Sequence, residues 1–176
     1  MSIRRRTMIG IAAAIWLPTA LAPPVSAQAS PTHASHTSLE PVAMAHARGT
    51  FEVQLTPHAP EAGADGTVPA RLTLDKQFHG DLEATSHGQM LAASTGVEGS
   101  AGYVAMERVH GTLQGRSGSF VLQHSGTMDR GSQKLSITVV PDSGTEELAG
   151  LAGRMDIIIA NGTHSYEFEY TIPEAR

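Results

Sequence analysis

From Gly49 onward, hydrophobic and polar residues alternate with a period of two. In the segment TFEVQLT every second residue is apolar, and the residues between them are polar. The same spacing recurs in residues 71–78 and 166–172. Successive side chains of a strand point to opposite faces, so this pattern predicts strands with one buried face and one solvated face. Such strands are typical of antiparallel sheets.

Turn-forming residues separate these segments and set the expected fold class. They are Asp65-Gly66, Gly99-Ser100, Arg116-Ser117-Gly118, Asp129-Arg130-Gly131 and Asn161-Gly162. No long amphipathic helix is indicated. Seven or eight strands at this spacing predict an all-β sandwich or barrel, and the 18 glycines favour the tight corners of a small barrel. We therefore expect residues 49–176 to form one antiparallel β-barrel domain.

The hairpin around residues 115–118 is expected to carry a histidine on its inner face. A four-residue turn at 115–118 would place Val109 opposite His124, with Phe120 on the same face. Glu107 falls on this face as well, diagonal to His124. A carboxylate and an imidazole are therefore expected among apolar core side chains.

Two further turns predict the faces of the remaining strands. A turn at 129–132 places His124 opposite Ile137, which again directs the histidine inward. The Asn-Gly turn at 161–162 places Ile157 opposite Tyr166 and directs the aromatic residues of the last strand inward. These aromatics are Tyr166, Phe168 and Tyr170. We interpret them as core residues first and as a surface for ligand stacking second.

The pair formed by Glu107 and His124 has three open interpretations. A buried carboxylate beside an imidazole can act as a general acid–base couple. It can also be a polar plug held by hydrogen bonds, because unpaired polar groups are costly to bury. A pair at one end of a barrel can simply face water.

Residues 1–27 have the pattern of a secretory signal peptide. Three arginines form a basic head, an apolar stretch follows, and small residues end at Ala27. Pro18 and the short apolar run argue against a stable membrane span. Arg5 and Arg6 also resemble a twin-arginine export signal, so both export routes stay open. We expect a periplasmic or secreted protein that is cleaved near Ala27.

Residues 28–48 are rich in Ala, Ser, Pro, Thr and His and have no period, which predicts a flexible tether. His33, His36 and His46 in this segment are interpreted as incidental histidines rather than metal ligands. A zinc site at Glu83 and His87 is not favoured either, since no clear third ligand accompanies them and a bend at Gly80 leaves their facing open. No metal and no cofactor are predicted.

Net charge and cysteine content narrow the function classes. The formal net charge is −5, and removal of the three arginines in the leader makes it −8. An acidic surface disfavours binding to nucleic acid and to anionic lipid. The chain has no cysteine, which excludes disulfides, thiolate catalysis and a lipidated N-terminal cysteine.

Three blocks of the sequence resemble a bacterial family. They are LDKQFHGDLEATSHGQML, GSAGYVAMERVHGTLQGRSGSFVLQHSGTMDRG and LSITVVPDSGTEELAGLAGRMDI. The family is domain-of-unknown-function family 3224, and the resemblance runs from about Gly49 to Pro173. It implies a small antiparallel barrel similar to allene oxide cyclase, often oligomeric, with no established activity. No cyclase motif aligns with this chain, so no catalytic residue is carried over.

Three hypotheses of function follow. The leading one is an exported β-barrel that binds a small apolar ligand inside, with Glu107 and His124 as polar anchors. The second is an isomerase- or cyclase-like enzyme that uses the same pair for proton transfer. The third is a structural or self-associating envelope protein whose barrel is filled by its own side chains. An interior cavity would separate the third from the others, and pH-dependent turnover would separate the second from the first.

Overall fold

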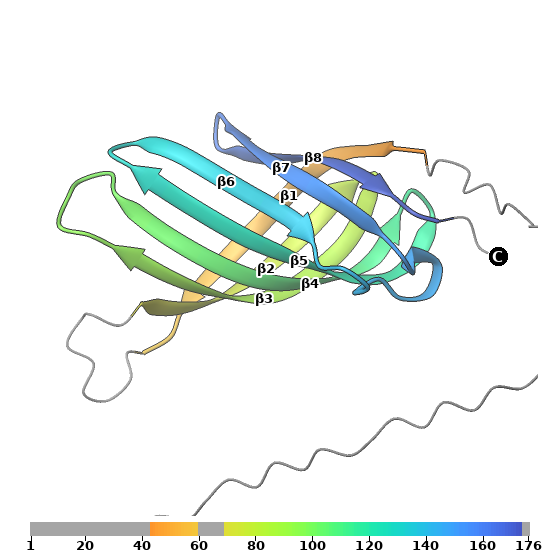
Figure 1. Cartoon of the computed structure of the whole chain (residues 1–176), viewed down its shortest axis with the longest axis horizontal. Helices are drawn as coiled ribbons and strands as arrows, with labels where there is room; N and C mark the ends of the chain where they lie inside the picture. Colours follow the sequence, from red (N-terminus) through yellow and green to blue (C-terminus); the bar gives the residue numbers. More distant parts are fainter. Residues whose placement is uncertain (1–42, 60–68, 174–176) are drawn as a thin grey trace, which may run out of the picture. The chain divides into compact units, whose positions relative to one another are not determined.

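The computed structural model describes residues 43–59 and 69–173, which form a closed antiparallel barrel (Figure 1). Each strand pairs with its neighbour in sequence, and the last strand returns to pair with the first. The strands are β1 Ala45–Pro57, β2 Ala70–Gly80, β3 Leu82–Ser94, β4 Ala101–Leu113, β5 Arg116–Asp129, β6 Ser132–Val139, β7 Ala152–Ala160 and β8 Thr163–Thr171. The predicted all-β class is confirmed, as a barrel rather than a sandwich. The ring closes most weakly between β6 and β7, which share a single register pair, Thr138 with Arg154.

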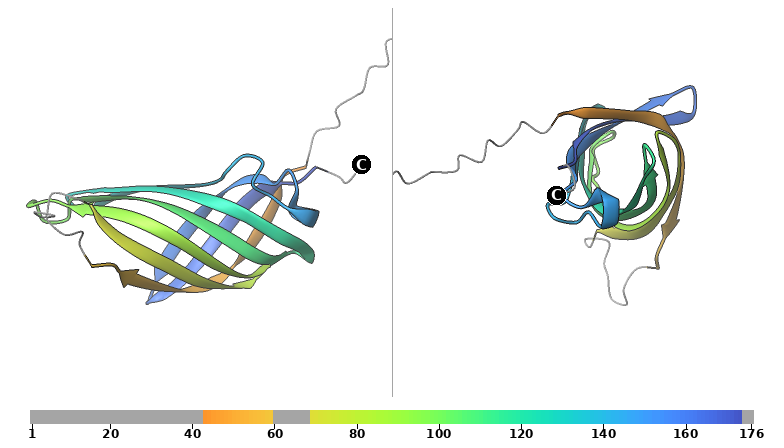
Figure 2. Two further views of the ribbon diagram at one scale, coloured as in Figure 1. Left: turned by 90° about the horizontal axis from the view of Figure 1, so that it is seen from below. Right: turned by 90° about the vertical axis from the view of Figure 1, so that its right-hand side faces the viewer.

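The strands form a ring around one interior (Figure 2). Buried or partly buried residues alternate with exposed ones along these strands. In β3 the pattern is strict from Leu82 to Gln89. The inward side chains form one core that includes Phe78, Phe120 and Phe168. Full burial of one such side chain contributes about 1.5–3 kcal/mol, so this core is the main source of stability.

The two ends of the barrel differ. One end is covered by the short 3-10 helix η1, Glu146–Leu148, and by Leu151, which follows it. Leu148 and Leu151 are buried, and Thr145 ties this segment to β5 through backbone and hydroxyl hydrogen bonds with Ser119. The opposite end is formed by the tips of the β3–β4, β5–β6 and β7–β8 hairpins (Figure 1). We call these the capped end and the open end.

Within residues 43–59 and 69–173, the structure has no helix of the length and apolarity needed to cross a lipid bilayer.

Three hairpins close through two-residue turns. Both turn residues have positive φ in Gln114-Gly115, Arg130-Gly131 and Asn161-Gly162, as expected for type I′ turns. The last two confirm the predicted registers, since His124 lies opposite Ile137 and Ile157 lies opposite Tyr166.

The predicted register of the β4–β5 hairpin is wrong. Val109 lies opposite Phe120 instead of His124, because the turn is at Gln114-Gly115 rather than at 115–118. Gly118 belongs to β5, and a Cβ there would collide with the carbonyl oxygen of Thr145. This glycine therefore allows the capping segment to approach the strand. The register differs by four residues, an even number, so the inner and outer faces are those that were predicted.

The strand β1 begins at Ala45, inside the range 28–48 that the composition predicts to be a tether. Ala45 and Ala47 point inward opposite Tyr170 and Phe168 of β8, and Ala47 is fully buried. The small side chains of alanine contribute little to the alternation of hydrophobic and polar residues. The beginning of this strand could therefore not be recognised from the sequence. The leader, the remainder of the tether with His33 and His36, and the Asp65-Gly66 turn lie outside the described residues.

Candidate functional site

Three charged or titratable side chains converge inside the barrel. Lys76 comes from β2, Glu107 from β4 and His124 from β5. Glu107 lies opposite Leu122, which makes it the diagonal neighbour of His124 across the β4–β5 pair. This confirms that the two predicted residues share the inner face and adjoin each other.

Lys76 reaches the pair from the far side of β3. The intervening residues on the inner face of β3 are Ser86, opposite Lys76, and Gly88, opposite Glu107. A Cβ at Gly88 would meet the backbone and the Cβ of Glu107. Because β3 presents only small residues here, the lysine side chain can cross it and contact the carboxylate.

A single carboxylate oxygen receives both basic groups. The Lys76 ammonium donates to Glu107 Oε2 at 2.7 Å, and His124 Nε2 lies 3.0 Å from the same oxygen without the geometry of a hydrogen bond. Lys76 Nζ also lies 5.0 Å from the ring centroid of Phe51 and 5.5 Å from that of Phe78, as in cation–π contacts. The three residues are buried: counted with their backbone atoms, Glu107 is 0 % exposed, His124 3 % and Lys76 8 %.

The Glu107 carboxyl is ionised at all ordinary pH values. Burial raises its pKa, but contact with His124 and with Lys76 lowers it more. The net result is a pKa of about 2. The interior of the barrel therefore holds a permanent negative charge that is neutralised mainly by Lys76.

The hydrogen bonding of this cluster is incomplete. Among the described residues, the buried side-chain atoms without a hydrogen-bond partner are Ser86 Oγ, Glu107 Oε1 and His124 Nε2. Buried polar atoms are normally satisfied, and each exception calls for an explanation. All three atoms belong to this one cluster.

A cavity of about 400 Å³ lies between the cluster and the open end. Its size falls within the usual range of small-molecule sites. Lys76 and His124 border it, whereas most of its wall is apolar or aromatic. The wall includes Phe51, Val53, Leu74, Tyr103, Ala105 and Leu135. A second hollow of about 380 Å³, nearer the hairpin tips, shares Met90, Tyr103 and Gln133 with it.

Tyr103 stands at the boundary of the two hollows. It faces Gly126 across the β4–β5 pair, and its ring occupies the space that a side chain at Gly126 would need. Burial raises the pKa of the Tyr103 phenol, and the negative charge of Glu107 raises it further. The hydroxyl therefore stays protonated and can donate a hydrogen bond.

The three predicted aromatic residues of β8 are buried on the other side of the cluster. Tyr166 accepts a hydrogen bond from the Leu82 N–H at 2.9 Å, and Tyr170 donates to Gln114 Oε1 at 2.6 Å. Phe168 stacks on Phe120 with ring centroids 5.8 Å apart. None of the three borders the 400 Å³ cavity. Their role in ligand binding stays a prediction, while their role in the core is plain.

Lys76 is the site residue that sequence reasoning missed. It occupies an inward position in the alternating series Leu72, Leu74, Lys76, Phe78. A lysine at a position where the alternation expects an apolar side chain could have indicated a buried charge.

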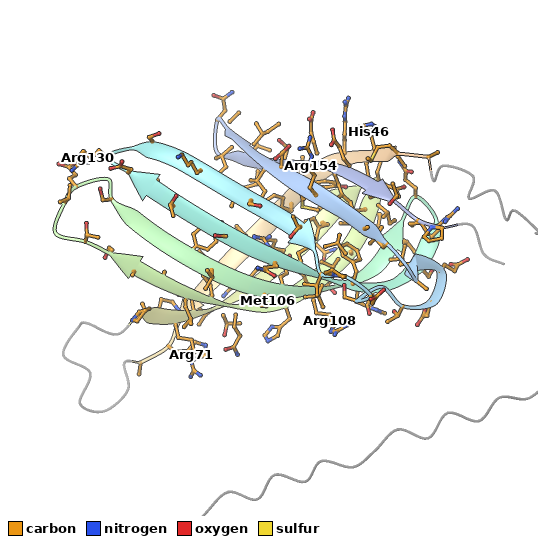
Figure 3. The ribbon with its side chains drawn as sticks, in the orientation of Figure 1. His46, Arg71, Met106, Arg108, Arg130 and Arg154 are labelled. Atoms are coloured by element: carbon orange, nitrogen blue, oxygen red, sulfur yellow. The ribbon has the colours of Figure 1, made fainter. Side chains whose placement is uncertain are left out.

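The other polar candidates lie on the outer face. Glu83 and His87 are exposed, and His87 Nδ1 is 2.7 Å from an Asp75 carboxylate oxygen. His46 points outward beside β8, near Arg154 (Figure 3). Within the described ranges no three His, Asp or Glu side chains are grouped as a metal site would require.

Comparison with protein families shows to which family this barrel belongs. The model of the family described as "Protein of unknown function (DUF3224)" matches residues 47–170. The chain belongs to this family. A crystal structure of a protein with unknown function from the DUF3224 family of Shewanella oneidensis MR-1 is 52% identical, with a TM-score of 0.70. The match covers 76% of this chain and 100% of that chain. A comparison with curated proteins found no match.

Proposed function

We propose that this DUF3224 protein binds a small, largely apolar molecule in the cavity at the open end of the barrel. Lys76 and His124 form the polar base of the site, and Glu107 holds both from behind. The observation that carries the proposal is the cavity itself, with about 400 Å³ of space between apolar walls and a buried charged cluster.

This arrangement supports binding better than a purely structural barrel. A barrel filled by its own side chains would leave no space of this size. The cluster is also a poor plug, because Glu107 Oε1 and Ser86 Oγ have no partner. Replacing a buried ion pair with apolar residues is often neutral or stabilising, so packing alone gives little reason for the pair.

Proton transfer through Glu107 is less well supported. An efficient general acid or base has a pKa near the working pH. The pKa of Glu107 is about 2, so this carboxylate is a weak base and is not available as an acid. This low pKa therefore favours a site that binds over an isomerase- or cyclase-like site in which Glu107 transfers the proton.

Filling the cavity tests the proposal. Ala105 borders the cavity and is buried, whereas its neighbour Val104 is exposed on the outer face. We expect Ala105→Phe to abolish binding of a neutral apolar dye such as Nile red, and the matched control Val104→Phe to retain it. Dye fluorescence measures binding, and circular dichroism checks that each variant folds. Equal binding by both variants would refute the site.

We also propose that the barrel works outside the cytoplasm. The support for export is the basic, apolar and small-residue order of residues 1–27. Native mass spectrometry of protein purified from its own periplasm would report signal cleavage, oligomeric state and bound ligand together. A cytoplasmic full-length chain would contradict export.

A further inference from the structure

The two hollows of the barrel follow one another toward the open end. Residues of all eight strands border the 400 Å³ cavity, so it lies inside the closed ring. Within the described part of the chain, the residues that border the 380 Å³ hollow come from β2 to β6. The β3–β4 and β5–β6 hairpins extend farther than the β7–β8 hairpin (Figure 1). The second hollow therefore leads from the inner face of this extension into the ring.

Three residues border both hollows and mark the passage between them. They are Met90 of β3, Tyr103 of β4 and Gln133 of β6. The Tyr103 ring lies against β5 at Gly126, in the space that a Cβ at this position would occupy. The absence of a side chain at Gly126 thus lets the ring lie close to the wall of the barrel.

The walls of this path are mainly apolar, and its base carries no net charge. Ala70, Leu72 and Met128 are among the apolar residues around the second hollow. At the base of the cavity, the charge of Lys76 is balanced by Glu107, 2.7 Å away. A ligand that brings an unbalanced charge into such a place pays a desolvation cost that nothing offsets. An uncharged molecule that fills both hollows would bury the most apolar surface.

We propose that the ligand is an uncharged, elongated apolar molecule that occupies both hollows, and that Gly126 keeps the passage open by giving the Tyr103 ring a place against the wall. This rests on the proposed binding function of the same cavity. A side chain at position 126 would displace the ring from β5 toward the interior, because the passage lies on its other side. Tyr103 and Gly126 thereby set the length of ligand that the barrel accepts.

Two uncharged hydrocarbons of different length test the inference on the whole mature protein. Naphthalene is compact enough for one hollow, whereas diphenylhexatriene is a rigid rod. Fluorescence titration measures binding of the rod, and equilibrium dialysis measures binding of naphthalene. We expect the wild type to bind both, and the rod more tightly, because the rod buries more apolar surface.

One glycine variant closes the passage, and a neighbouring glycine provides the matched control. In Gly126→Ala, we expect the affinity for the rod to fall about tenfold or more, the usual consequence of forcing extra volume into an occupied space. Binding of naphthalene should stay at the wild-type level. Gly102→Ala should leave both affinities unchanged, because its Cβ would meet only the Gly126 carbonyl oxygen, at an ordinary 3.7 Å.

Two further variants identify the displaced ring as the cause. The double variant Gly126→Ala, Tyr103→Leu should bind the rod again, because it lacks the ring that the alanine displaces. Circular dichroism checks that each variant folds. If Gly126→Ala does not fold, Gln133→Trp narrows the same passage from β6 and should weaken binding of the rod alone.

The outcomes separate this inference from the function on which it rests. A folded Gly126→Ala that binds both probes like the wild type would overturn the role of the passage but leave the binding site. Equal weakening of both probes, or a double variant that does not recover rod binding, would overturn it as well. A wild type that binds naphthalene but not the rod would overturn the elongated ligand. Binding of neither probe would count against both the inference and the proposed function.

Discussion

Lys76 and Glu107 form an ion pair with a nitrogen–oxygen distance of 2.7 Å, and their side chains are 6% and 0% exposed. The two residues come from strands that are not neighbours, since β3 lies between them. A lysine and a glutamate are almost never this deeply buried unless they are paired. The pair contributes little net stability by itself, but removal of one partner leaves a charge without compensation.

Acid should weaken the fold through Glu107. Its pKa is lowered from 4.5 to about 2, so the folded state favours the carboxylate. The resulting stability, about 3 kcal/mol, is present above the unfolded pKa and is lost as the pH falls from about 4.5 through about 2. Urea unfolding of wild type across this range should show the loss, and Glu107→Gln should lack it. As a control, Glu169→Gln on the exposed face should leave this loss in place.

Removal of one partner of the ion pair should destabilise the fold, whereas replacement of both partners with apolar residues should not. Lys76→Met leaves Glu107 buried without its cation, and we expect about 3–5 kcal/mol of destabilisation near neutral pH. The double variant Lys76→Met, Glu107→Leu should regain most of this loss. A double-mutant cycle by denaturant unfolding measures the coupling. If the changes in the free energy of unfolding are additive, the contact contributes no coupling energy.

Gly118 should be intolerant of a methyl group. A Cβ there would collide with the Thr145 carbonyl oxygen and press on the Leu148 side chain. We expect Gly118→Ala to cost about 1–3 kcal/mol, the usual cost of overpacking, by loosening the cap. Gly96→Ala is the control, because a Cβ at Gly96 meets nothing within 4 Å. Thermal unfolding should separate the two variants, and equal melting temperatures would contradict the packing role.

Loss of the Tyr166 hydroxyl should affect stability rather than ligand binding. The hydroxyl accepts from the buried Leu82 N–H and donates to the His79 carbonyl oxygen. Tyr166→Phe leaves that N–H unpaired, which costs about 1–3 kcal/mol. Nile red binding should stay at the wild-type level, since Tyr166 does not border the cavity. Weaker dye binding by a fully folded variant would place this tyrosine in the site after all.

The exported protein should begin at Gln28. The small residues that end at Ala27 match the sequence preferred before a signal cleavage site. The intact mass of protein recovered from the periplasm or medium measures the cleavage position directly. A mass that includes residues 1–27 would exclude it.

The face on which each inward residue lies was predictable from the sequence. A period of two assigns every side chain of a strand to one of two faces, and only an odd shift in register exchanges the faces. The β4–β5 register was wrong by four residues, with Val109 opposite Phe120, yet Glu107 and His124 remained on the inner face. The turns at Arg130-Gly131 and Asn161-Gly162 could be predicted, because each contains a glycine, which adopts positive φ without strain.

The partnership of Lys76 with Glu107 was decided by the tertiary structure. The alternation places Lys76 inward, but it does not say which of seven other strands supplies its partner. Closure of the barrel and the small residues on β3 bring the two side chains together. The cap formed by Leu148 and Leu151, and the open cavity at the opposite end, also depend on how distant segments pack. Local pattern determines the direction of each side chain, whereas contact and empty space arise only when the strands close around a common interior.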